Sequence, residues 1–251
     1  MDEILRVKKL IRNYEKPSRD GTKEEIKVLK GLDFTINEQE FVAIMGKSGC
    51  GKTTLLKVLG LIDRPTGGTF YFKGKEVKKL WNDELSDIRR REIGFVFQDF
   101  YLMDSLSVEE NVMLPLILDK ANVNHCFDKA RKYEKLFEIS HLSHKNPYEL
   151  SGGEKQRVAI CRALVNDPDV IFADEPTGNL DSRSGAIVIK ALENINTKMK
   201  KTIVMVTHDP QIASHCNRII FLKDGKILKD LRRQGTKEGF YYNILEMMKE
   251  L

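Results

Sequence analysis

Hydrophobic residues follow two different periods along this chain, and each period predicts a type of secondary structure. Leu5 to Leu10 and Val28 to Ile36 alternate apolar and polar side chains, which predicts strands of a small antiparallel layer. Phe41 to Met45 is a continuous apolar run, as expected for a strand buried on both faces of a parallel sheet. Apolar residues then recur at helical spacing from Lys52 to Ile62, until turn formers at residues 63–68 end the predicted helix.

The middle of the chain, residues 99–166, has helical rather than strand patterns. Two serines lie three residues before a glutamate, Ser107 before Glu110 and Ser151 before Glu154, and this spacing predicts a capping box at the start of a helix. Strands and helices alternate again after this region. We predict strands at Val170–Ala173, Thr202–Val206, Arg218–Leu222 and Lys226–Leu228, helices at Ser184–Ile195 and at residues 236–251, and a hairpin turn at Asp224-Gly225.

A glycine-rich segment directly follows the continuous apolar strand. Gly46 to Thr53 matches the pattern GxxxxGK[ST], with a predicted strand before it and a predicted helix after it. Glycines let the backbone wrap round phosphate groups, while Lys52 adds a positive charge and Thr53 a hydroxyl for Mg²⁺. A glycine-rich turn without a ligand is the alternative, but the flanking elements favour nucleotide binding. The residues expected to contact the nucleotide here are Gly46, Ser48, Gly49, Cys50, Gly51, Lys52, Thr53 and Thr54.

Strands and helices in this order, with the phosphate loop between them, predict an α/β fold. We expect a P-loop NTPase core with a mainly parallel sheet, an N-terminal antiparallel β layer and an inserted α-helical subdomain at about residues 99–166. A single domain is expected to span residues 1–251, with a helical tail at about residues 236–251. Residues 17–22 are rich in turn formers and predict an exposed loop.

Polar side chains follow two of the predicted strands. Asp174 and Glu175 end one of them, and ligands bind at the carboxyl ends of strands in open α/β sheets. We assign Asp174 to the metal and Glu175 to polarising the attacking water as general base. His208 follows the next strand, where it could contact the γ-phosphate or steady the water. The alternatives are that Asp174 and Glu175 are only a polar pair at the end of a strand, and that His208 is an ordinary surface histidine.

Composition narrows the class of protein. Hydrophobic residues are 41% and charged residues 31% of the chain, as in globular proteins. The longest apolar run, Val112 to Leu118, is far shorter than the ~20 residues of a membrane span, and no signal-peptide pattern opens the chain, so we expect neither a span nor export. Four cysteines without CxxC spacing fit a reducing cytosol. The net charge of +5 is spread over the chain, and we expect no nucleic-acid partner.

Taken together, these motifs resemble the ATPase subunit of ATP-binding cassette (ABC) transporters over almost the whole chain. Six elements stand in the family's order: Tyr14, the phosphate loop, Gln98, the signature segment Leu150 to Gln156, the pair Asp174-Glu175 followed by Asn179-Leu180-Asp181, and His208. The resemblance implies that Tyr14 stacks on adenine and that Gln98 senses Mg²⁺ and the membrane partner. It also implies that Thr53, Gln98 and Asp174 serve the metal, and that Glu175, His208 and Gln98 serve catalysis.

The resemblance also gives the predicted helix start at Ser151 a second role. A helix N-terminus with glycine N–H groups is an anion site, although an ordinary capping box is the simpler interpretation. By resemblance, Ser151, Gly152, Gly153 and Glu154 meet the γ-phosphate of ATP that is held by the phosphate loop of a second copy. A head-to-tail homodimer would then contain two ATP sites about a twofold axis. Lys155, where many members carry glutamine or arginine, is not expected to disturb this contact.

Finer details of the sequence indicate a branch of the family. The segments at residues 14–28, 60–66 and 178–181 resemble the macrolide-exporter and lipoprotein-release branch, and those at residues 97–102 and 238–245 resemble its bacitracin-type peptide-antibiotic resistance members. This resemblance implies a polytopic permease partner and a place on the inner face of the cell membrane. A cell-division or signalling ATPase of the same design remains an alternative. Proteins of this family that act on ribosomes or DNA usually contain two cassettes in tandem or long coiled-coil insertions, and this sequence shows neither feature. A small-molecule kinase would share the phosphate loop but would not need the signature segment.

Overall fold

The computed structural model describes residues 2–17 and 23–251. The chain divides into two compact units, one formed by Met1–Leu85 with Val204–Leu251 and the other by Ser86–Ile203. The boundaries fall within a helix and a strand, α2 (Asn82–Arg91) and β8 (Thr202–Val206). The loop predicted at residues 17–22 lies outside the described residues, except for Pro17 at the end of a strand.

The first unit contains the predicted antiparallel layer. Its strands stand in the order β2-β1-β4-β5, and each neighbouring pair is antiparallel. Their bounds are β1 (Glu3–Pro17), β2 (Lys23–Asn37), β4 (Gly67–Phe72) and β5 (Lys75–Glu76). The pattern did not predict β4, because it begins with two glycines that are typical of a turn. In this strand, position 68 must be a glycine, because a Cβ there would lie 2.1 Å from the backbone oxygen of Lys9.

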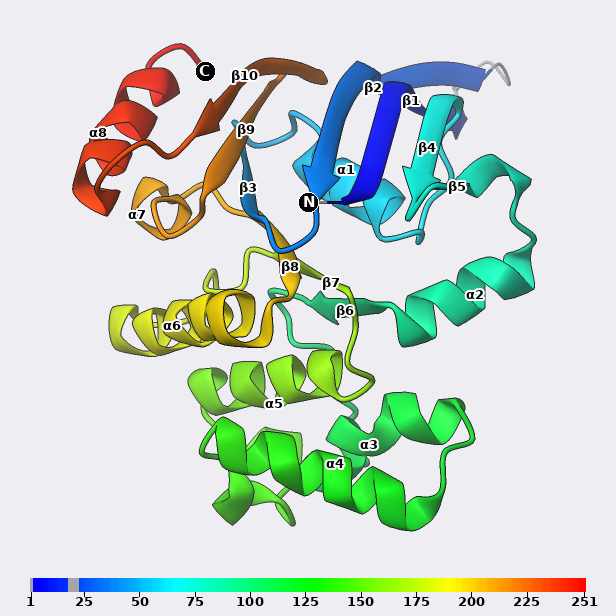
Figure 1. Ribbon diagram of the computed structural model, residues 1–251, viewed down its shortest axis with the longest axis vertical. Helices are drawn as coiled ribbons and strands as arrows, with labels where there is room; N and C mark the ends of the chain where they lie inside the picture. The colour runs from blue at the N-terminus through cyan, green and yellow to red at the C-terminus, as the bar shows by residue number, and fades with distance from the viewer. Residues whose placement is uncertain (1, 18–22) are drawn as a thin grey trace. The chain divides into compact units, whose positions relative to one another are not determined.

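The first unit also contains strands in the order β10-β9-β3-β8. Strand β3 (Phe41–Met45) is wholly buried, as predicted, and runs parallel to β9 (Arg218–Lys223). Asp224 and Gly225 have φ values of 49° and 78°, which confirms the predicted hairpin turn between β9 and β10 (Lys226–Arg232). Figure 1 shows β9 between β3 and β10.

Three α-helices and the short 3₁₀ helix η1 (Val77–Lys79) lie wholly within the described part of the first unit. The α-helices are α1 (Lys52–Leu59), α7 (Pro210–Ala213) and α8 (Lys237–Met248). The predicted helix to Ile62 is three residues too long, because Gly60 caps α1 and Leu61 adopts a left-handed φ of 60°. The predicted C-terminal helix is confirmed as α8, which begins after the capping residue Thr236 and buries Phe240 and Ile244.

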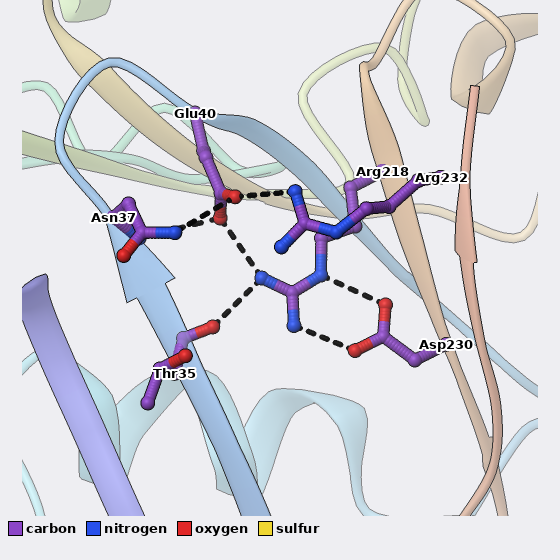
Figure 2. A network of polar contacts seen from close by, with 6 residues as sticks. All are labelled: Thr35, Asn37, Glu40, Arg218, Asp230 and Arg232. Atoms are coloured by element: carbon purple, nitrogen blue, oxygen red, sulfur yellow. Dashed lines mark hydrogen bonds and ion pairs between the residues drawn. The ribbon is translucent and has the colours of Figure 1, made fainter. Parts of the chain in front are cut away.

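A partly buried ion-pair network connects three strands of the first unit with Glu40, in the loop before β3 (Figure 2). Arg218 is 4% exposed and donates two hydrogen bonds to the carboxylate of Asp230, at 2.8 and 2.6 Å. A further nitrogen of Arg218 donates to Glu40 at 2.9 Å and to the backbone oxygen of Thr35 at 2.7 Å. Arg232 donates to the other oxygen of Glu40 at 2.8 Å. The network joins β2, β9 and β10 to the residue that precedes β3.

The second unit combines a pair of parallel strands with a group of helices. β6 (Ile93–Val96) pairs with β7 (Val170–Asp174), and the sequence analysis predicted no strand at β6. The four long helices that lie wholly in this unit are α3 (Val108–Leu118), α4 (Val123–Leu136), α5 (Gly152–Leu164) and α6 (Ser182–Met199). Both predicted capping boxes are confirmed, at Ser107 before α3 and at Ser151 before α5.

Helices α3, α4 and α5 pack against one another, as the green ribbons of Figure 1 show. Their shared core holds buried side chains from each helix: Val112, Leu116, Ala130, Tyr133, Val158 and Cys161. All three helices lie between residues 99 and 166, which is the stretch where the sequence has helical patterns. The expectation of one domain over the whole chain stays a prediction.

Candidate functional site

The phosphate-loop motif forms the connection between β3 and α1 in the first unit. The strand is buried, Lys47, Ser48 and Gly49 are exposed, and Lys52 begins the helix. The ammonium group of Lys52 donates to the backbone oxygens of Gly46 at 2.8 Å and Lys47 at 3.0 Å. This lysine therefore lies across the loop, with its charge beside the backbone that would surround a phosphate.

Two glycines of the loop are required by its geometry. A Cβ on Gly46 would lie 2.3 Å from the backbone oxygen of Leu222 and 2.6 Å from the sulfur of Cys50. Gly51, the N-cap of α1, has a φ of 106°, which is strained for any residue with a side chain. Within the described chain no side chain caps this helix, and its first turn contains no acidic residue. The N-terminus of α1 therefore keeps the positive potential that favours a phosphate.

Cys50 occupies the last of the four variable positions of this motif and is buried. Its side chain is buried, and burial raises the pKa of the thiol above its usual value even though Lys52 lies nearby. A thiol with a raised pKa stays protonated and is a poor nucleophile. Cys50 therefore contributes packing and backbone to the loop, not charge.

Tyr14 lies on β1 in a cluster of polar groups. Its hydroxyl donates to Asp63 at 2.6 Å, and the Arg12 guanidinium lies 4.3 Å from the centre of its ring. Arg12 also contacts Asp63, with 3.6 Å between the charged atoms. One face of the Tyr14 ring is thus taken by Arg12, so an adenine has the other face or the guanidinium plane on which to stack. The role of Tyr14 stays a prediction.

His208 lies just after β8 and is exposed. The preceding residue, Thr207, donates its backbone N–H to Ile44 of β3 at 3.3 Å, two residues before the phosphate loop begins. Asp209 then caps α7 and fixes the chain on the other side of the histidine. Within the first unit, His208 is therefore held on the segment that adjoins the strand leading into the phosphate loop.

Asp174 and Glu175 lie at the end of β7 in the second unit. Asp174 is the last residue of the strand, and Glu175 adopts a left-handed φ of 46°, a conformation that costs free energy and is typical of functional sites. The turn after it is held at two points. Gly178 donates its N–H to the oxygen of Glu175 at 2.9 Å, and the buried Gln156 of α5 donates to the oxygen of Pro176 at 2.8 Å.

Gln98 follows β6 and belongs to the same unit as this turn. Its side-chain nitrogen donates to the side-chain oxygen of Asn179 at 3.1 Å. The segment after it is held by Arg162 of α5, which donates to the backbone oxygens of Phe100 at 2.6 Å and Tyr101 at 2.5 Å. Arg162 is a residue that the motifs did not indicate, because its partners lie 61 and 62 positions away in the sequence.

The signature segment begins α5. The hydroxyl of Ser151 bonds to the Glu154 carboxylate at 2.7 Å, and the backbone N–H of Ser151 donates to the same carboxylate at 2.8 Å. These bonds hold the pKa of Glu154 below its usual value. A Cβ on Gly153 would lie 2.9 Å from the hydroxyl of Ser184, so this glycine lets α5 approach α6 closely. The capping box is thus confirmed, while the contact with a second copy's phosphate stays a prediction.

The predicted site residues therefore fall into two groups. The first unit holds the phosphate loop, Tyr14 and His208, and the second unit holds Gln98, the signature and the acidic pair Asp174-Glu175. Within residues 2–17 and 23–251, no cluster of three or more His, Cys, Asp or Glu side chains could hold a metal ion. No helix in the described part of the chain has the length and apolarity to cross a membrane.

Comparison with known proteins agrees with this arrangement. Residues 29–178 match the ABC transporter family model, which is more than half of the chain. The bacitracin export ATP-binding protein BceA of Halalkalibacterium halodurans is 43% identical over 228 residues, which are 90% of each chain. The macrolide export ATP-binding/permease protein MacB of Campylobacter jejuni is 46% identical over 84% of this chain, but over only 33% of its own length.

A solved structure shares the fold. It is the dimeric, post-hydrolysis state of the ATP-binding cassette MJ0796 bound to ADP and Pi, with 40% identity and a TM-score of 0.83 over 92% of this chain and 100% of that one. The fold and the phosphate loop thus define a nucleotide-hydrolysing cassette with a P-loop NTPase core. The chain belongs to the ABC transporter ATP-binding family. The predicted family, fold class and ATPase activity are thereby confirmed.

Proposed function

We propose that this chain is the ATP-hydrolysing subunit of an exporter for peptide antibiotics or similar amphipathic substrates. In this proposal it drives a polytopic permease from the inner, cytoplasmic face of the cell membrane. The match to BceA carries the proposal, because it extends over 90% of both chains and so includes the segments outside the family model. MacB, a fused ATP-binding/permease protein, supports a permease as the partner.

The phosphate loop binds ATP in this proposal. The backbone of Gly46 to Gly51 surrounds the β-phosphate, and Lys52 supplies charge toward the β- and γ-phosphates. Tyr14 contacts the adenine. Thr53 and Thr54 follow the loop directly in the first turn of α1, where Thr53 is exposed and Thr54 is half-buried.

The residues assigned to Mg²⁺ have the chemistry that this ion prefers. Thr53 offers a hydroxyl, Asp174 a carboxylate and Gln98 an amide oxygen, and all three are hard oxygen ligands. When bound with ATP, the ion neutralises phosphate charge. Glu175 takes the proton of the attacking water as general base, from a turn that Gln156 and Gly178 hold in place. His208 steadies the γ-phosphate or the water.

A second copy completes each site. The N-terminus of α5 offers Ser151 and the N–H groups of Gly152 and Gly153 to an anion. A head-to-tail dimer lets this N-terminus close on the γ-phosphate that the other copy holds, so one copy alone cannot form a full site. The dimeric MJ0796 cassette supports association of two copies.

Transport can be tested in cells that carry the chain with the permease that copurifies with it. We expect the pair to protect cells against a peptide antibiotic such as bacitracin, and the Glu175→Gln variant to abolish protection at equal expression. Protection that is unchanged in this variant would show that ATP hydrolysis by the chain does not drive export. The signalling alternative predicts a changed transcriptional response with no change in antibiotic efflux from inverted vesicles.

A further inference from the structure

The side chains of Gln98 and Asn179 are joined amide to amide in the second unit. Gln98 follows β6, and Asn179 follows the turn after β7, which begins at Glu175. The Asn179 side-chain nitrogen donates to the backbone oxygen of Gln98 at 3.1 Å and to the carboxylate of Asp99 at 3.0 Å. The Asn179 oxygen accepts from the side-chain nitrogen of Gln98 at 3.1 Å. One asparagine thus makes three hydrogen bonds to two consecutive residues.

These partners determine which way both amides face. A backbone oxygen and a carboxylate can only accept hydrogen bonds, so the Asn179 atom that faces them must be nitrogen. The other Asn179 atom is then the oxygen, which also only accepts. The Gln98 atom that faces it must therefore be nitrogen, and the Gln98 oxygen is directed away from Asn179. Oxygen and nitrogen of an amide are otherwise hard to tell apart, but here the chemistry of Asp99 and of the backbone assigns them.

Gly178 brings the Gln98 amide close to the backbone of this turn. A Cβ on Gly178 would lie 2.9 Å from the Gln98 nitrogen and 3.0 Å from the amide carbon. Any other residue would displace the amide. Gly178 also donates to the oxygen of Glu175 at 2.9 Å, so the turn that begins with the proposed general base also holds Gln98.

We propose that Asn179 is a positioning residue that turns the Gln98 amide so that its oxygen is presented to Mg²⁺. This inference rests on the proposed role of Gln98 as a metal ligand. Mg²⁺ binds oxygen, and the NH₂ group of an amide is not a ligand for it. Without Asn179, the amide can present either group, and the loop that carries it loses two further bonds from the same side chain.

The test measures metal binding rather than turnover. Mn²⁺ serves as the probe for Mg²⁺, and electron paramagnetic resonance follows free Mn²⁺ during titration of the full chain, which is kept in excess over ATP so that unbound ATP does not compete for the ion. All variants are made in the Glu175→Gln background to limit hydrolysis. Asn179→Ala should weaken Mn²⁺ binding about threefold to tenfold, as expected for the loss of one or two ordinary hydrogen bonds.

Two comparisons separate positioning from a general structural effect. The matched control is Asn166→Ala in the same unit, which removes one hydrogen bond to the backbone oxygen of Arg90 at 2.7 Å and should leave Mn²⁺ binding unchanged. In a Gln98→Ala background, Asn179→Ala should have no further effect, because there is no amide left to orient. An equal loss in both backgrounds, or no loss in either, would overturn the proposal.

A second measurement reports on the amide without any metal. In ¹⁵N–¹H spectra of the metal-free chain, the Gln98 side-chain signal should shift in Asn179→Ala and stay in place in Asn166→Ala. An unmoved signal in Asn179→Ala overturns the proposal. If Gln98→Ala itself leaves Mn²⁺ affinity unchanged, the metal role given to Gln98 under the proposed function is wrong. If Gln98→Ala weakens binding and Asn179→Ala does not, only the positioning role is wrong.

Discussion

Replacing Arg218 with methionine should destabilise the first unit, because it leaves the buried carboxylate of Glu40 without its main partner. The Glu40 side chain is 8% exposed and that of Arg218 is 4% exposed. Removing one member of a buried ion pair costs about 3–5 kcal/mol. Arg232 still contacts Glu40, but its side chain is 59% exposed, and such exposed pairs contribute only about 0–1 kcal/mol. The expected loss is therefore at the lower end, about 3 kcal/mol.

Urea unfolding of the full chain measures this loss. At a slope of about 3 kcal/mol/M, the midpoint of the transition should fall by roughly 1 M. Far-UV circular dichroism is the suitable signal, because the single tryptophan, Trp81, is 80% exposed and reports poorly on the core. The double variant Arg218→Met/Glu40→Met should unfold at a higher urea concentration than Arg218→Met alone, since it leaves no buried charge unpaired.

The effect should also depend on pH. Burial by itself raises the pKa of Glu40, but the charge of Arg218 and hydrogen bonds from Arg232 and Asn37 outweigh it and leave this pKa below its usual value of 4.5. Glu40 thus stabilises the wild-type fold above pH 4.5, and this contribution is lost as the pH falls through the lowered pKa. Arg218→Met should therefore cost less at pH 4 than at pH 7. An equal cost at both values, or a double variant less stable than the single one, would refute the reasoning.

Three further predictions concern the nucleotide site and its supports. Glu175→Gln should still bind ATP, hydrolyse it on the order of 10²–10⁴-fold more slowly and accumulate as a dimer on size exclusion, and wild-type turnover would rule out this general base. Lys52→Ala should abolish productive ATP binding in calorimetry, whereas unchanged affinity would contradict the phosphate-loop assignment. Arg162→Met removes two charged hydrogen bonds to backbone oxygens and should cost about 3 kcal/mol of unfolding free energy in urea. A loss under about 0.5 kcal/mol would show that water replaces them.

Local sequence signals predicted the parts of the structure in which neighbouring residues determine the conformation. The capping box at Ser151, the Asp224-Gly225 hairpin and the buried strand before the phosphate loop each depend on residues within a few positions. The Arg12 contact with Tyr14 could also have been predicted, because residues two apart on a strand share a face. By contrast, Asn179 and Gln98 lie 81 positions apart, and only the tertiary fold brings them together.

Helix α5, which begins at the signature segment, also contacts two turns that are distant in the sequence. The motif alone does not indicate these contacts, which Gln156 and Arg162 make. Gln156 binds the oxygen of Pro176, next to the proposed base, and Arg162 binds the oxygens of Phe100 and Tyr101, which follow Gln98. Burial lowers the pKa of the Arg162 guanidinium below its usual value, although it stays charged at neutral pH. Because Gln156 and Arg162 belong to one helix, a shift of α5 relative to these turns would strain the hydrogen bonds to both of them.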